Sequence, residues 1–361
     1  MRRKSDKRHV DAFFMVIYVA LLPGHSFRWQ TSFANQPNRS LPLLLTDPAA
    51  MSWKPLALDP RVEAKWDSIN SEEALAELSR IELPNSIEQE DRSFPGPNGN
   101  ELVVSIFRRK ISTNRKRLCI YHIHGGGMIA GDRFLGVNWY FDVIDRYDVV
   151  LVTIEYRLAP ANPYPAPVED CYAGMIWTAE HADELGIDAE KILTAGGSAG
   201  GGLCVAMNLL LRDRKGPKVI GQFLLTAMLN DRVDTISAHQ TSHIKGWNRD
   251  ADIYGWTCYL GELRETDSVS PYAAPSRATD LSGLPPTYLD VGAVDVFRDE
   301  DVKFALDLCR DGVPCEFHLW PGCTHGTDAM LPDIPVSVAA NRIKKDWLER
   351  FFADNGVELV G

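Results

Sequence analysis

The sequence predicts an α/β fold, in which a mostly parallel sheet of eight strands is flanked by helices and carries a helical cap. Short apolar runs alternate with longer helical stretches, a pattern typical of a parallel sheet covered on both faces. One of these runs leads through a glycine-rich turn directly into a helix. The composition, 45% hydrophobic and 24% charged, indicates neither disorder nor several membrane spans.

The predicted elements follow the chain in order. Residues 51–90 have helical signals, with an acidic start and periodic apolar positions in Ser71–Leu78. Turn residues crowd positions 94–100, and Leu102–Phe107 then alternates in the manner of a strand, which predicts an antiparallel hairpin at the sheet edge. The remaining strands are predicted at Leu118–Ile123, Val149–Ile154, Ile192–Ala195, Gln222–Ala227, Thr287–Val291 and Cys315–Leu319.

The interval Leu229–Leu284 is too long for a simple crossover between two strands. Its aromatic and polar residues predict an inserted helical cap, to which residues 51–90 also contribute. We therefore expect one elaborated domain over residues 51–361, preceded by an extension over residues 1–50.

The extension has two interpretations. Met1–Val10 is basic, Phe13–Leu22 is apolar and small residues follow, as in a secretory signal peptide. The apolar run is shorter than the about 20 residues of a membrane span. Alternatively, the protein starts near Met51. The cysteines show no disulfide pattern and look like free thiols. They favour this second interpretation and, with it, a cytoplasmic protein.

Deletion of residues 1–50 is expected to leave folding and activity intact, because no motif and no predicted strand lies there. Circular dichroism and activity measurements on the truncated and full-length proteins would check this. An insoluble or inactive truncated protein would place the extension within the cap.

Charge and cysteine content narrow the function classes. A formal net charge of −11 disfavours nucleic-acid binding, which needs clustered Lys and Arg, and favours a neutral small-molecule substrate. The seven cysteines are scattered, and Cys119, Cys204 and Cys309 fall in apolar stretches, so we expect buried thiols without a disulfide framework. His122 and His124 lie on one predicted strand without a third ligand, so no metal is expected.

The glycine-rich turn predicts a catalytic nucleophile. Gly196-Gly-Ser-Ala-Gly200 follows a strand and precedes a helix, which is the context of a nucleophile elbow with Ser198 at its tip. Glycines allow the sharp turn because they add no side chain near the backbone. A nucleotide-binding loop is the alternative, but neither a following Lys-Ser/Thr nor a dinucleotide fingerprint is present.

His124-Gly-Gly-Gly127 follows the strand Leu118–Ile123, where hydrolases with such an elbow carry oxyanion donors. We expect the backbone N–H groups of Gly125, Gly126 and Ala199 to stabilise a developing oxyanion, each contributing about 10²- to 10³-fold in rate. His124 is expected to brace this loop by hydrogen bonding.

Asp295 and His325 each follow a late strand, where parallel sheets place active-site loops. The chain order Ser198, Asp295, His325 is that of an α/β-hydrolase triad. Asp295 is expected to orient His325, the general base. Rival acids and bases in strands, helix starts or the cap are Asp290, Asp299, Glu300, Asp301, His239, His243 and His318.

These motifs resemble the hormone-sensitive-lipase-like group of α/β-hydrolases, also described as the alpha/beta-hydrolase-3 or arylesterase/carboxylesterase type. The resemblance runs from about Leu118 to the end of the chain. It implies the α/β-hydrolase fold and hydrolysis of carboxylic esters with short or medium acyl chains through an acyl-enzyme, without a cofactor. It rests on His124-Gly-Gly-Gly, Tyr156-Arg-Leu-Ala-Pro, Tyr164-Pro-Ala-Pro-Val-Glu-Asp, Gly196-Gly-Ser-Ala-Gly-Gly, the Asp295 loop and His325-Gly.

Two positions depart from the family pattern. Gly197 stands where an acid or threonine is usual, so substrate preference by subfamily does not carry over, and Ala161 replaces a usual Glu. The motifs also leave open a lactone or amide hydrolase, an acyltransferase of a biosynthetic pathway, and a small-molecule receptor on the same scaffold. Receptors that resemble this family typically lack the base, whereas His325 is present.

Other residues have a structural and a functional interpretation. We expect Arg157 to hold loops beneath the site and Tyr156 to pack. Large apolar residues belong either to the substrate pocket or to the core. These are Met128, Trp139, Trp247, Trp256 and Tyr259.

Overall fold

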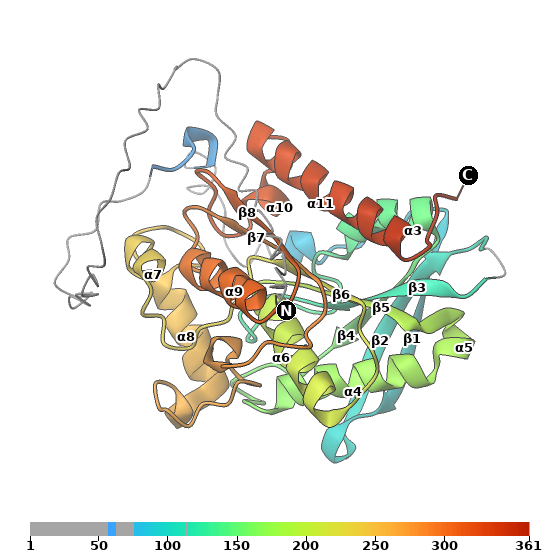
Figure 1. Ribbon diagram of the computed structural model, residues 1–361, viewed down its shortest axis with the longest axis horizontal. Helices are drawn as coiled ribbons and strands as arrows, with labels where there is room; N and C mark the ends of the chain where they lie inside the picture. The colour runs from blue at the N-terminus through green and yellow to red at the C-terminus, as the bar shows by residue number, and fades with distance from the viewer. Residues whose placement is uncertain (1–56, 63–75, 113–114, 361) are drawn as a thin grey trace, which may run out of the picture. The chain divides into compact units, whose positions relative to one another are not determined.

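The computed structural model describes residues 57–62, 76–112 and 115–360. Eight strands form one sheet in the order β1-β2-β4-β3-β5-β6-β7-β8, and helices cover both faces (Figure 1). The predicted fold class is confirmed. The extension over residues 1–50 lies outside the described residues, as does part of the segment 51–90.

The first two strands form the antiparallel edge hairpin. β1 (Ile87–Pro95) pairs with β2 (Glu101–Arg109), which pairs antiparallel with β4 (Val150–Glu155). The helical prediction for residues 51–90 is wrong at its end, because pairing with β2 overrides the weak helical propensity of residues 87–90. The other strands are parallel: β3 (Arg117–Ile123), β5 (Ile187–Gly197), β6 (Gly221–Leu225), β7 (Thr287–Gly292) and β8 (Cys315–Trp320).

Two apolar layers hold the helices against the sheet. One layer joins α3 (Phe141–Tyr147) and α11 (Pro335–Asp354) to the sheet, and the other joins α4 (Ala166–Glu180), α6 (Ala199–Arg214) and α9 (Arg298–Arg310) to its opposite face (Figure 1). Every residue of α6 from 199 to 211 is buried, as expected of a helix that is apolar on all sides.

The interval between β6 and β7 contains the helices α7 (Ile236–Gln240) and α8 (Arg249–Leu260). The side chain of Asn248 accepts hydrogen bonds from the first N–H groups of α8 and so fixes where that helix begins. Other short helices are η2 (Pro97–Gly99), η3 (Val137–Tyr140), α5 (Ala182–Leu185), η4 (Gly261–Leu263), η5 (Pro275–Arg277) and α10 (Thr327–Met330).

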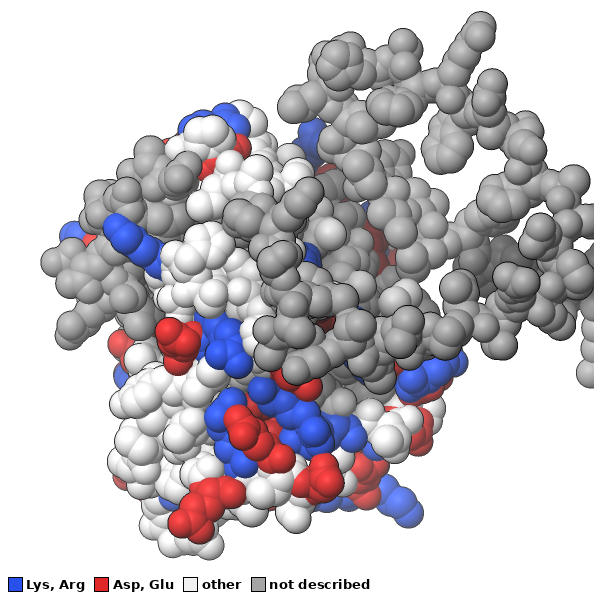
Figure 2. Space-filling view, turned by 90° about the vertical axis from the view of Figure 1, so that its left-hand side faces the viewer, with Lys and Arg blue, Asp and Glu red and all other residues white. Residues whose placement is uncertain are grey.

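The cysteines are free thiols, as expected, but one of those expected to be buried is exposed. All seven cysteines are free, and Cys119 and Cys204 are buried, but Cys309 is exposed because it faces outward from α9. Basic and acidic side chains lie next to one another on the face shown in Figure 2. Across the described ranges, the structure has no helix that is both long and apolar enough to span a membrane.

Candidate active site

Ser198 sits at the sharp turn between β5 and α6. Its φ of 56° and ψ of −126° are sparsely populated for a residue with a side chain. The neighbouring β6 segment holds this strained backbone on both sides. The N–H of Ser198 donates to the carbonyl of Leu225 at 2.8 Å, and the carbonyl of Ser198 accepts from the N–H of Met228 at 3.0 Å.

The glycines around Ser198 allow close backbone approaches. A Cβ at Gly196 would lie 2.5 Å from the carbonyl oxygen of Gly200, and one at Gly200 would lie 2.1 Å from that of Ile123. At Gly202 a Cβ would lie 2.1 Å from the carbonyl oxygen of Met228. Side chains at these positions would therefore displace the elbow from the sheet.

Ser198, His325 and Asp295 form one hydrogen-bonded chain. Nε2 of His325 lies 3.0 Å from Oγ of Ser198, and Nδ1 lies 3.0 Å from Oδ2 of Asp295. Asp295 is 1% exposed, and its Oδ1 accepts the N–H of Phe297 at 3.0 Å. The structure thus brings together the three residues that the sequence predicted as a triad, at distances suited to proton transfer.

Thr226 also contacts this chain, and sequence reasoning missed it. Its hydroxyl donates to Oδ2 of Asp295 at 2.5 Å and lies 3.4 Å from Nδ1 of His325. The predicted strand Gln222–Ala227 placed Thr226 inside β6. The strand in fact ends at Leu225, because Thr226 takes a φ of 47°. A polar residue ending an apolar strand is the one signal in the sequence that could have pointed to it.

The loop of three glycines lies directly against Ser198. A Cβ at Gly125 would lie 3.3 Å from Cβ of Ser198, and one at Gly126, whose φ is +102°, would lie 2.0 Å from the carbonyl oxygen of Ala130. Outside regular helices and strands, no hydrogen bond between described residues uses the N–H groups of Gly125, Gly126 or Ala199. These donors are therefore available beside Ser198.

His124 is fully buried behind the loop and stacks on Tyr156, with ring centroids 4.1 Å apart. Nδ1 of His124 lies 2.8 Å from the carbonyl of Gly125, and the Tyr156 hydroxyl donates to the carbonyl of His124 at 2.9 Å. Burial lowers the pKa of His124 to about 4, so the ring is neutral near pH 7. A neutral ring bonded to the glycine loop suits the bracing role.

The family assignment follows from a comparison with known families. Residues 120–329 match the family described as having the alpha/beta hydrolase fold, and this segment contains the elbow, the glycine loop, Asp295 and His325. The chain belongs to the α/β-hydrolase family. The resemblance to the hormone-sensitive-lipase-like group is also confirmed, because its relatives are esterases of that type.

Named relatives of this α/β-hydrolase cover most of its length. Esterase LipI of Mycobacterium tuberculosis is 28% identical over 301 residues, 83% of this chain and 91% of that protein. An arylesterase of Saccharolobus solfataricus is 33% identical over 59% of this chain and 69% of that protein. The solved structure of a bacterial heroin esterase is 33% identical and covers 80% of this chain and 96% of that one, with a TM-score of 0.76.

The rival acids of this α/β-hydrolase bind other groups. Asp299 accepts the N–H of Ser237 at 2.7 Å, Asp301 accepts that of Ala227 at 3.0 Å, and Glu300 accepts that of Leu229 at 2.7 Å. These acids therefore do more than interact with the dipole of α9. They also fix the chain that leaves β6. Burial raises the pKa of both Glu300 and Asp301.

The remaining rivals have their own partners or lie in the cap. Asp290 accepts from the indole of Trp320 at 3.0 Å and pairs with buried Lys344 at 3.4 Å. Nε2 of His318 lies 3.0 Å from Oε1 of Glu316. The bases His239 and His243 lie in the interval between β6 and β7.

Arg157 supports the loop after β4 through Asp170. Its guanidinium donates to both carboxylate oxygens of Asp170 at 2.7 Å, and its backbone N–H donates to Oδ2 at 3.0 Å. Because Asp170 is fully buried on α4, this bidentate pair fixes the loop to the helix, in the structural role expected for Arg157.

Among the pocket candidates, Trp247 lies nearest the triad. Its ring centroid is 6.5 Å from that of His325, and a Cβ at Gly127 would lie 2.0 Å from its indole. The pocket interpretation of Trp139 is wrong, because that residue packs on Phe223 in the layer under α3 and α11. The other candidates are almost fully buried in the core: Met128, Trp256 and Tyr259.

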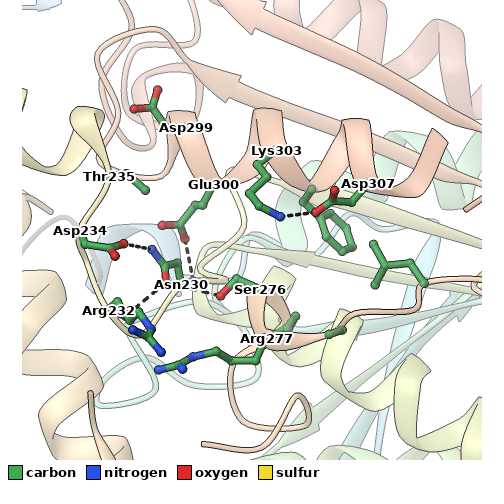
Figure 3. A pocket seen from close by; sticks show the side chains of 14 residues that line it. Asn230, Arg232, Asp234, Thr235, Ser276, Arg277, Asp299, Glu300, Lys303 and Asp307 are labelled. Carbon is green, nitrogen blue, oxygen red and sulfur yellow. Dashed lines mark hydrogen bonds and ion pairs between the residues drawn. The ribbon is translucent and has the colours of Figure 1, made fainter. Parts of the chain in front are cut away.

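A cavity of about 240 Å³ lies between α9 and the segments around Asn230 and Arg277, and no triad residue lines it (Figure 3). Its charged side chains are paired locally: Arg277 binds Asp231 at 2.7 Å, and Lys303 contacts Asp307. These pairs favour a structural role for the cavity wall.

Proposed function

We propose that this chain hydrolyses carboxylic esters of short to medium acyl length, with Ser198 as nucleophile, His325 as general base and Asp295 as its orienting acid. The observation that carries the proposal is the continuous chain from Oδ2 of Asp295 through the His325 ring to Oγ of Ser198, with both distances 3.0 Å. Relatives named esterase, carboxylesterase and arylesterase support the reaction type.

In the first half-reaction, Oγ of Ser198 attacks the ester carbonyl while Nε2 of His325 takes its proton. The negative charge that forms on the carbonyl oxygen is stabilised by the N–H groups of Gly125, Gly126 and Ala199. The tetrahedral intermediate then expels the alcohol, which receives the proton from His325. The acyl group remains as an ester on Ser198.

In the second half-reaction, water gives a proton to His325 and attacks the acyl-enzyme carbonyl. Collapse of this intermediate releases the carboxylic acid and returns the proton to Oγ of Ser198. Asp295 keeps the Nδ1–H tautomer of His325 and stabilises the imidazolium in both halves. Each step uses protein groups, substrate and water, so the proposal requires no cofactor.

Hydrolysis of a graded substrate panel tests the proposal. The panel contains p-nitrophenyl esters from acetyl to dodecanoyl, simple lactones and an anilide, with Ser198→Ala protein as the background. We expect turnover of the acetyl to octanoyl esters well above that background. Faster turnover of lactones or anilides would favour the alternative hydrolase, and preferred transfer of the acyl group to an added alcohol would favour an acyltransferase.

Replacing Trp247 by Ala is expected to shift the preference toward longer acyl chains, because the indole occupies space beside the glycine loop and His325. Each extra buried methylene contributes about 0.8 kcal/mol, or roughly fourfold in kcat/KM. The octanoyl-to-acetyl ratio of kcat/KM should therefore rise about tenfold or more.

Trp177→Ala is the matched control for this change. Trp177 is a half-buried tryptophan on α4 that stacks on Phe94 and His181, so its loss should leave the chain-length ratio unchanged. An equal loss of activity on every ester in the Trp247 variant would show that the indole supports the glycine loop and does not limit the pocket.

A further inference from the structure

We propose that Thr226 is a positioning residue of the triad, whose hydroxyl fixes the carboxylate of Asp295 for its bond to His325. The inference rests on the proposed triad. It assigns to Thr226 a share in orienting the general base, without contact with the substrate.

The hydrogen bonds of Asp295 show why a third donor matters. Its Oδ1 has one donor, the N–H of Phe297 at 3.0 Å. Its Oδ2 has two, the Thr226 hydroxyl at 2.5 Å and Nδ1 of His325 at 3.0 Å. Because the carboxylate is 1% exposed, water cannot replace a missing donor. The hydroxyl therefore defines the direction in which Oδ2 meets the imidazole.

The backbone of Thr226 gives an independent reason to assign a function. Its φ of 47° is unfavourable for a β-branched residue, whereas glycine would adopt it freely. The N–H of Thr226 donates to the carbonyl of Asp290 at 2.7 Å, which holds this conformation at the carboxyl end of β7. Strained backbone conformations cluster at active sites. Here the hydroxyl bond to Asp295 gives a reason for a threonine at a position where glycine would fit without strain.

The end of β6 and the residues after it, 225–230, contact both Ser198 and the chain around Asp295. Thr226 lies within this segment. Leu225 and Met228 hold the backbone of Ser198 through bonds of 2.8 and 3.0 Å. Ala227 donates to Asp301, and Leu229 and Asn230 donate to Glu300. These two buried acids lie six and five residues after Asp295. Because the hydroxyl of Thr226 also binds Asp295, the segment fixes the distance between Ser198 and Asp295.

Three other buried carboxyls surround the Asp295 site. Glu300 and Asp301 are buried carboxyls that interact electrostatically with Asp295, and Asp252 of α8 does so as well. Burial raises the pKa of all three groups. Within this group of buried carboxyls, the Thr226 hydroxyl donates to Oδ2 of Asp295.

Three substitutions at position 226 separate the hydroxyl from shape and strain. Thr226→Val keeps the shape and the strain without the hydroxyl, Thr226→Ser keeps the hydroxyl, and Thr226→Gly removes both hydroxyl and strain. Thr194→Val is the matched control, because that buried threonine bonds Asn208 on α6 and contacts no triad residue. For each protein, kcat and KM on an acetyl ester, the rate of fluorophosphonate labelling and the unfolding midpoint are measured.

We expect Thr226→Val to lose about 10- to 100-fold in kcat and in labelling rate, the factor for one hydrogen bond to a charged group, with KM within about twofold. Thr226→Ser should stay within about threefold of wild type. Thr226→Gly should be as slow as the valine variant while unfolding at an equal or higher temperature. Thr194→Val should keep the wild-type labelling rate.

Wild-type kcat in the valine or glycine variant would overturn the inference, as would equal losses in the valine and serine variants, which would indicate packing. A Ser198→Ala sample in the same series keeps this outcome separate from a failure of the proposed function. If Ser198→Ala is still labelled, the nucleophile is wrong. If it is unlabelled while Thr226→Val behaves as wild type, only the role of Thr226 fails.

Discussion

Ser198→Ala is expected to lower kcat on an acetyl ester by about 10⁶-fold, the loss found when a triad serine is removed from a related mechanism. Without Oγ no acyl-enzyme can form, and the N–H groups of the glycine loop support only slow attack by water. Labelling by a fluorophosphonate probe should disappear as well, because that reagent needs a serine activated by a base beside oxyanion donors.

Both effects are measured on protein shown to be folded by circular dichroism. Ser276→Ala is the control, because Ser276 lines the cavity beside α9 and its hydroxyl lies 3.5 Å from Oδ1 of Asn230. That variant should be labelled and should turn over ester at the wild-type rate. Persistent labelling of Ser198→Ala would move the nucleophile to another serine.

Asp295→Asn is expected to leave the fold intact and to lower kcat by about 10⁴-fold. The native carboxylate accepts at both oxygens, from Phe297 on one side and from Thr226 and His325 on the other. An amide has only one oxygen, so either orientation points its NH₂ group at a donor. Facing Nδ1, that group favours the imidazole tautomer with a proton on Nε2, which cannot accept the proton of Ser198.

Asp299→Asn is the matched control for this prediction. Asp299 lies in the same stretch of chain, but it binds the N–H of Ser237 and the guanidinium of Arg298, each at 2.7 Å. An asparagine there keeps one acceptor, so the cost is about 1 kcal/mol of stability and kcat stays within a few-fold of wild type. Equal loss of kcat in the two folded variants would show that the acid is assigned to the wrong residue.

The features predicted well from sequence are those whose cause is local in the chain. A run of mostly apolar residues predicts β3, and these residues are buried in the structure. The glycines that allow the turn at Ser198 stand beside that serine in the sequence. The edge hairpin was predicted because its turn is marked by glycine and proline. Its first strand was misjudged, since Ile87 becomes a strand residue only by pairing with Arg109.

The features that sequence reasoning missed depend on contacts between distant segments. No pattern around Thr226 shows that its hydroxyl meets a carboxylate 69 positions later. The acidic start of α9 is visible in the sequence, but the N–H groups that Asp301 and Glu300 accept come from the end of β6. From the sequence alone, an aromatic residue such as Trp139 that lines a pocket cannot be told from one that packs in the layer under α11.

The glycines at the start of α6 limit how this protein can be stabilised by design. Helix propensity alone recommends replacing Gly202 with alanine, a change that gains about 1 kcal/mol in an exposed helix. Here the added methyl would lie 2.1 Å from the carbonyl oxygen of Met228, whose N–H holds the backbone of Ser198. A thermostability screen guided by propensity would thus displace the segment that holds Ser198, and should leave these glycines unchanged.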